Sequence, residues 1–118
     1  MIYLLDTNVL SELTKKRPSE SVVERLRRTT ADEVFSSAVS VMEIRFGTAR
    51  HPQGRRLWEK IQGQVLSRLT ILPIGLEEAR TAGDVLATLR AGGTPIGLED
   101  VLIGSTALVH DLTLVTRN

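Results

Sequence analysis

The chain has 118 residues, 42% of them apolar, which is enough for one globular domain and small for two. It contains no cysteine, which excludes disulfides and thiolate metal sites and favours the cytoplasm. No basic segment precedes the first apolar run, which ends at Asp6, so we expect neither a signal peptide nor a membrane span.

The net charge is only +1, but the charges are unevenly distributed. Residues 1–68 hold 12 Lys and Arg against 8 Asp and Glu, a net of +4, whereas residues 69–118 hold 3 against 6, a net of −3. The excess of Lys and Arg in residues 1–68 is suited to binding a phosphate backbone, although solvated helix faces have the same composition. With only one Trp, one Tyr and two Phe, a base-stacking platform of the OB or RRM type is not expected.

Apolar patterning predicts strands that alternate with helices. The strands are expected at 2–5, 34–37, 70–74 and 112–116, and the helices at about 8–14, 19–29, 39–50, 53–68, 76–91 and 98–110. This order predicts an α/β fold with three layers, in which a central, mainly parallel sheet of four strands lies between helices.

Polar residues are expected to meet at the carboxyl edge of this sheet, where open parallel sheets bind ligands. Asp6 directly follows the first strand and Asn118 the last, while Glu43 and Asp100 lie early in the helices after the second strand and before the fourth. Glu43 shares its helix face with Phe46, and Asp100 shares its face with Ile103, so both faces are expected to be buried. Glycine follows each acid at i+4, which we interpret as room for a neighbouring backbone.

Each acid also has an ordinary explanation. Asp6, with Thr7 and Asn8, is typical of a helix cap, Asp100 would be stabilised by the helix dipole, and Glu43 could form a buried ion pair. Together, however, three carboxylates within about 5 Å would repel by roughly 3 kcal/mol per pair at an effective dielectric near 20. A hard cation, Mg²⁺ or Mn²⁺, would relieve this repulsion and suits phosphodiester hydrolysis.

The segments LLDTNVLSEL, SSAVSVMEIRFG, GTPIGLEDVLIGSTAL and LTLVTRN, in this order, resemble the PIN-domain ribonucleases, most closely the VapC-type toxins of bacterial toxin–antitoxin pairs. The resemblance implies a single PIN domain over residues 1–118 and a metal-dependent endoribonuclease blocked by a cognate antitoxin. It also implies RNA as substrate and a homodimer. Family members usually continue with an aromatic residue and a fifth strand, which we expect to be missing here.

The resemblance also implies roles for individual residues. Asp6, Glu43 and Asp100 match the catalytic, metal-binding acids, and Asn118 falls where many members carry a fourth acid or an asparagine. The residues that match the positions shaping the site are Thr7, Asn8 and Thr116. Glu99 is a further candidate, expected on a different helix face from Asp100.

Three alternatives stay open on the sequence. The first is a metal-dependent phosphoryl-transfer enzyme, although Asn8 stands where a haloacid-dehalogenase-type site carries a second Asp. The second is a metal-free ribonuclease that uses His51 and His110 as acid and base. The third is a catalytically inactive binding scaffold. Trp58 is expected to pack its helix into the core, with antitoxin docking as the minority interpretation.

Overall fold

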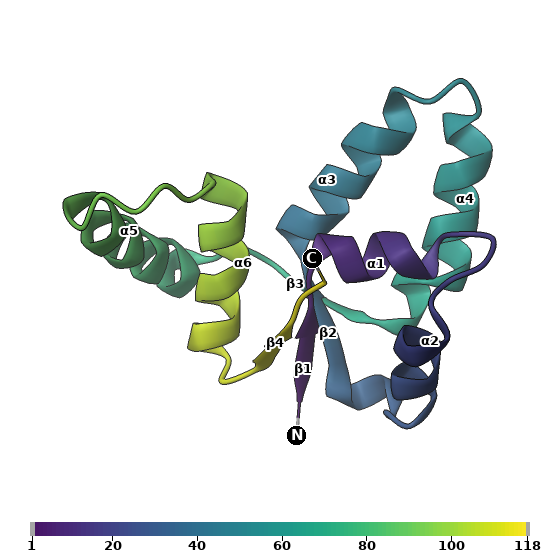
Figure 1. The fold of residues 1–118 in the computed structure, drawn as a ribbon, viewed down its shortest axis with the longest axis horizontal. Helices are drawn as coiled ribbons and strands as arrows, with labels where there is room; N and C mark the ends of the chain where they lie inside the picture. Colours follow the sequence, from purple (N-terminus) through teal and green to yellow (C-terminus); the bar gives the residue numbers. More distant parts are fainter. Residues whose placement is uncertain (1, 118) are drawn as a thin grey trace.

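The computed structural model describes residues 2–117, which form a four-stranded sheet with helices on both faces (Figure 1). The strands are β1 (Tyr3–Leu5), β2 (Val34–Ser37), β3 (Thr70–Leu72) and β4 (Thr113–Val115). All neighbouring strands pair in parallel in the order β3-β2-β1-β4, and Leu4 of β1 aligns with Phe35 of β2 and Leu114 of β4. The predicted parallel sheet is therefore confirmed.

Two helices precede each strand after the first. They are α1 (Thr7–Leu13) and α2 (Glu20–Arg27), then α3 (Ala38–Ala49) and α4 (Gly54–Gln64), then α5 (Leu76–Ala91) and α6 (Leu98–Val109). Two short 3₁₀ turns lie at Ala31–Glu33 and Leu66–Arg68. The predicted helix over 53–68 was too long, because the chain tightens after Gln64 and places Leu66 in the core.

Alternation along β1 divides the core between the two faces of the sheet. Leu4 packs with Val39, Ile103 and Ala107 on the face that α6 covers, whereas Leu5 packs with buried side chains of α1 and α4 on the other face. Figure 1 shows α5 outside α6 on one side and the α3–α4 hairpin projecting on the other. The fold is thus the three-layer α/β/α arrangement expected from the sequence.

The strand order defines where a ligand site is expected. The chain moves outward from β1 through β2 to β3 and then returns to the opposite side of β1 with β4. The order therefore reverses beside the carboxyl ends of β1 and β4, the position at which open α/β sheets bind ligands. Among residues 2–117, no helix is long and apolar enough to cross a membrane.

Candidate active site

Asp6 ends β1 and begins α1, so it lies at the reversal point of the sheet. Its backbone N–H donates to Val115 O at 3.1 Å, and its Oδ1 accepts from Val9 N at 3.0 Å as the helix N-cap. Burial raises the pKa of the Asp6 carboxyl, the backbone N–H groups of Val9 and Asn8 lower it, and the negative charges of Asp100 and Glu43 raise it again; the net shift is upward. The capping role is therefore real, and the other two acids act on the same carboxyl.

Thr7 connects the start of α1 to α3. Its hydroxyl donates to Glu43 Oε1 at 2.6 Å and also forms a hydrogen bond with Ser40 Oγ at 2.9 Å. Ser40 is fully buried and Glu43 is half-buried, three residues further along the same helix. This contact ties the Glu43 carboxylate to the start of α1, and the roles of Thr7 and Glu43 in a site stay predictions.

Asp100 and Glu99 lie in the first turn of α6, whose N-cap is Gly97. A Cβ added to Gly97 would lie 3.5 Å from Glu99 Oε2 and 3.9 Å from Asp100 Oδ2. Both carboxylates lie near this glycine and both are exposed, so the expectation that Asp100 lies on a buried face is wrong. A role for Glu99 stays a prediction.

Two expectations about the surroundings of the acids are wrong. Phe46, which shares the face of Glu43, is 61% exposed instead of buried, because α3 extends beyond the sheet at this point. No neighbouring backbone approaches the glycines at i+4, Gly47 and Gly104: within the described part of the chain, a Cβ added to either meets nothing within 4 Å.

The residues predicted to shape the site occupy the end of β4 and the start of α1. Asn8 Nδ2 donates to the backbone oxygen of Arg117 at 3.2 Å, which ties α1 to the segment after β4. Thr116 is exposed and lines a groove between β4 and α2. The prediction for Asn118 lies outside the described residues.

Sequence reasoning missed two side chains in this region. Ser40 precedes Glu43 by one helical turn, a spacing that already put both on one face, but serine gave no signal of its own. Glu12 lies four residues after Asn8 and is buried despite its charge. A carboxylate on the inward face of α1 was the available signal.

The donor chemistry of the three acids fits a hard cation. Asp6, Glu43 and Asp100 supply only oxygen ligands, and no ion pair within residues 2–117 gives any of them a basic partner. In the same range, no three Asp, Glu or His side chains converge closely enough to hold a metal as they stand. The structure thus brings the acids to one edge and couples them electrostatically, without closing them around an ion.

The two histidines do not form a pair. His51 Nδ1 accepts from Gln53 N in the turn between α3 and α4, whereas His110 caps the carboxyl end of α6 and contacts Glu78 Oε1 at 2.9 Å. His110 therefore precedes β4 and lies at the amino edge of the sheet, opposite the acids. This placement does not support the metal-free alternative.

Trp58 packs against the core, as expected, and the Arg45 guanidinium lies 5.0 Å from the centre of its ring. The two residues line a cleft between α3 and α4 of about 550 Å³. His51, Arg55 and Glu59 also line this cleft, and Arg55 lies 3.9 Å from Glu59.

A parallel sheet with this strand order and acids at its carboxyl edge defines an α/β domain of the class that binds ligands at the ends of its strands. The sequence matches the PIN domain over residues 3–118. It is 35% identical to VapC ribonuclease Y4jK of Sinorhizobium fredii and 33% identical to Toxin FitB of Neisseria gonorrhoeae, in each case over 98% of this chain and 86% of the relative. DNA-bound VapBC from Salmonella typhimurium superposes with a TM-score of 0.91 at 30% identity, covering 100% of this chain and 87% of that one.

The chain therefore belongs to the PIN-domain family, and within it to the VapC type.

Proposed function

We propose that this protein is the metal-dependent endoribonuclease toxin of a toxin–antitoxin pair. The observation that carries the proposal is that Asp6, at the end of β1, is affected by the negative charges of Glu43 on α3 and Asp100 on α6. The raised pKa of Asp6, caused in part by the charges of the other two, supports their proximity. The name of the Sinorhizobium relative supports ribonuclease activity.

Asp6, Glu43 and Asp100 are the residues that would hold Mg²⁺ or Mn²⁺. Bound there, the cation would activate a water for attack on phosphorus and screen the negative charge that develops on the phosphate oxygens. Thr7 fixes the Glu43 carboxylate through its 2.6 Å hydrogen bond, and the backbone N–H of Val9 fixes that of Asp6. These two contacts reduce the reorganisation that closing the site requires.

An antitoxin and a second copy of the chain are the proposed protein partners. The similarity to DNA-bound VapBC supports the first, and the family resemblance alone supports the second. Co-expression with the neighbouring gene product, followed by size-exclusion chromatography with light scattering, measures both associations.

The activity is tested with RNA substrates and purified wild type, Asp6→Asn and Asp100→Asn proteins. Cleavage is expected in Mg²⁺ or Mn²⁺, loss is expected with EDTA, and each substitution should lower the rate by about 100-fold or more. Asp84→Asn, an exposed acid in α5, is the matched control and should retain full activity. Equal cleavage by wild type and Asp6→Asn, or cleavage that resists EDTA, contradicts the proposal.

A further inference from the structure

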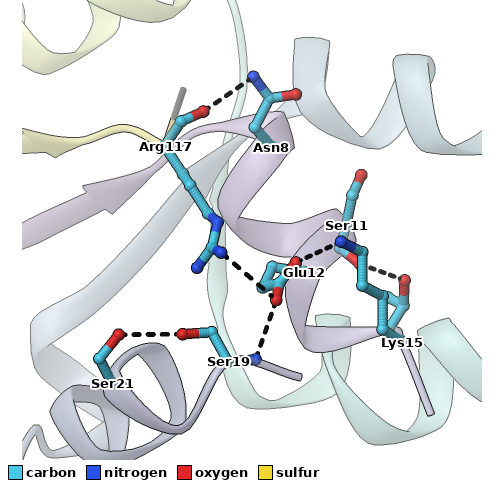
Figure 2. Close-up of polar contacts among 8 residues, drawn as sticks. Asn8, Ser11, Glu12, Lys15, Ser19, Ser21 and Arg117 are labelled. Carbon is cyan, nitrogen blue, oxygen red and sulfur yellow. Dashed lines mark hydrogen bonds and ion pairs between the residues drawn. The ribbon is translucent and has the colours of Figure 1, made fainter. Parts of the chain in front are cut away.

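Glu12 is a buried carboxylate with three partners (Figure 2). Its side chain is 6% exposed; Oε2 lies 2.7 Å from Lys15 Nζ, and Oε1 accepts from Ser19 N at 2.9 Å. Arg117 Nη2 lies 3.8 Å from Oε1. An unpaired buried charge is costly, so these contacts are what allow a glutamate at this position.

Arg117 is the distant partner, since it follows β4 while Lys15 and Ser19 belong to the turn after α1. Asn8 and Glu12 are one helical turn apart on α1, and both contact Arg117: Asn8 holds its backbone oxygen and Glu12 faces its guanidinium. Asp6 N donates to Val115 O just before it. Three successive contacts therefore fasten the end of β4 to the helix that Asp6 caps.

We propose that Glu12 is a positioning residue that acts through Arg117 to hold the segment after β4 against the acidic edge of the sheet. The inference rests on the proposed function, because the segment that Arg117 holds contains Thr116, which is predicted to shape the site, and is bound by Asn8, which has the same predicted role. Glu12 itself does not touch the acids' edge through any described contact; its effect is transmitted by the Arg117 side chain.

Replacing Glu12 with glutamine separates its charge from its role as a hydrogen-bond acceptor. The Ser19 N–H needs only an acceptor oxygen, which glutamine also supplies. Glutamine weakens both charge contacts of Glu12, with Lys15 at 2.7 Å and with Arg117 at 3.8 Å, so the Arg117 variants are needed to isolate the second contact. The side chain of Arg117 is 42% exposed, so replacing it opens no cavity in the core.

The test is a double-mutant cycle in RNA cleavage with Glu12→Gln, Arg117→Gln and the double variant. Each single change is expected to lower kcat by about 10-fold, and the double variant should be no slower than the slower single. Rate reductions that multiply, to about 100-fold, mean that Glu12 acts independently of Arg117 and overturn the proposal.

Glu24→Gln is the matched control, because Glu24 forms an exposed ion pair with Arg28 on α2 at 3.4 Å. It should cleave RNA like wild type. Should Glu12→Gln fail to fold, Arg117→Lys and Arg117→Gln carry the test: lysine should retain most of the activity and glutamine lose it. Equal activity of wild type and both Arg117 variants overturns the proposal.

A second readout separates this inference from the proposed function. Amide hydrogen exchange of residues 113–117 should accelerate in Glu12→Gln and Arg117→Gln but not in Glu24→Gln, whether or not the protein cuts RNA. If wild type and Asp6→Asn are both inactive, the proposed function fails, while this exchange pattern still decides the role of Glu12. Unchanged exchange in both variants overturns it.

Discussion

Among individual residues, Thr7 determines where the Glu43 carboxylate lies. Its hydroxyl donates to Glu43 and also contacts the buried Ser40 hydroxyl. Replacing it with an isosteric apolar side chain removes both contacts but keeps the packing volume. Thr7 is therefore the position at which to separate orientation of an acid from its charge.

We expect Thr7→Val to lower the free energy of unfolding by about 1–3 kcal/mol, because the Ser40 hydroxyl loses its partner in a buried place. RNA cleavage should fall with it, while Thr7→Ser, which keeps the hydroxyl, should remain close to wild type in both. Urea denaturation and cleavage rates measure the two effects. A valine variant with wild-type stability and rate would show that the hydrogen bond is dispensable.

The lowered pKa of the Glu78 carboxyl predicts that the free energy of unfolding depends on pH in the acid range. Its own backbone N–H, the His110 ring and the Gly75 N–H all donate to the carboxylate and hold its pKa below the ordinary value of 4.5. Because the folded state then binds fewer protons than the unfolded state, the stabilisation is complete above about pH 4.5 and is lost as the pH falls through the folded pKa.

Glu78→Gln should therefore be less stable than wild type near neutral pH, and the difference should shrink in acid. Urea unfolding curves from about pH 7 to about pH 3 measure the two dependences. Glu77→Gln is the control, since Glu77 is 70% exposed and its pair with Arg80 is at the surface. A wild-type–variant difference that stays constant over this range would contradict the linkage.

The position of a residue in the fold was predictable where it followed from the end of a strand. Asp6, Glu43 and Asp100 could be placed at one edge because parallel strands share their carboxyl ends. Glu12 and Ser40 could not, since their partners Arg117 and Thr7 come from other elements and only the packing brings them together.

Among the helices and strands, Asp6 lies at the junction of β1 and α1, where it caps α1 and is a proposed metal ligand; substitution can separate these two roles. Asparagine caps helices about as well as aspartate, whereas alanine does not cap. Asp6→Asn should therefore keep or raise the free energy of unfolding, because it also removes the repulsion from Glu43 and Asp100. Asp6→Ala should lower it by about 0.5–2 kcal/mol.

Thermal and urea unfolding of both variants without metal measure this difference. Both should be equally deficient in RNA cleavage, because both lack the carboxylate. An Asp6→Asn protein as unstable as Asp6→Ala would mean that the cap requires charge rather than a hydrogen-bond acceptor.

Most elements were predictable because their apolar patterns are local. The α5 helix over 76–91 and β2 over 34–37 were predicted with their observed bounds, whereas the strand expected at 70–74 stops at Leu72, just before Pro73, which cannot donate to a ladder. Exposure of Phe46 was not predictable from α3 alone. It depends on how far the helix extends past the sheet, which no local pattern contains.

For the molecule as a whole, the structure shows where the basic part of the sequence lies. The basic first part of the sequence includes α2, α3 and α4, and the α3–α4 hairpin projects from the body in Figure 1. Glu43 and Arg50 are seven residues apart, so α3 carries the chain about 10 Å outward from the acids at 1.5 Å per residue. An RNA cleaved at the acidic edge could extend along this hairpin.

We expect Arg55→Gln combined with Arg56→Gln, both exposed on α4, to weaken RNA binding similarly for different sequences. Binding is measured by fluorescence anisotropy with an Asp6→Asn protein, so that RNA stays intact, at several salt concentrations. The slope of log K against log salt should fall by about 0.7 for each phosphate of single-stranded RNA that the variant no longer neutralises. Arg90→Gln, an exposed arginine on α5, is the control and should leave affinity and slope unchanged. Because counterion release depends on which phosphates are neutralised and not on net charge alone, equal effects of the α4 and α5 substitutions would mean that RNA does not follow the hairpin.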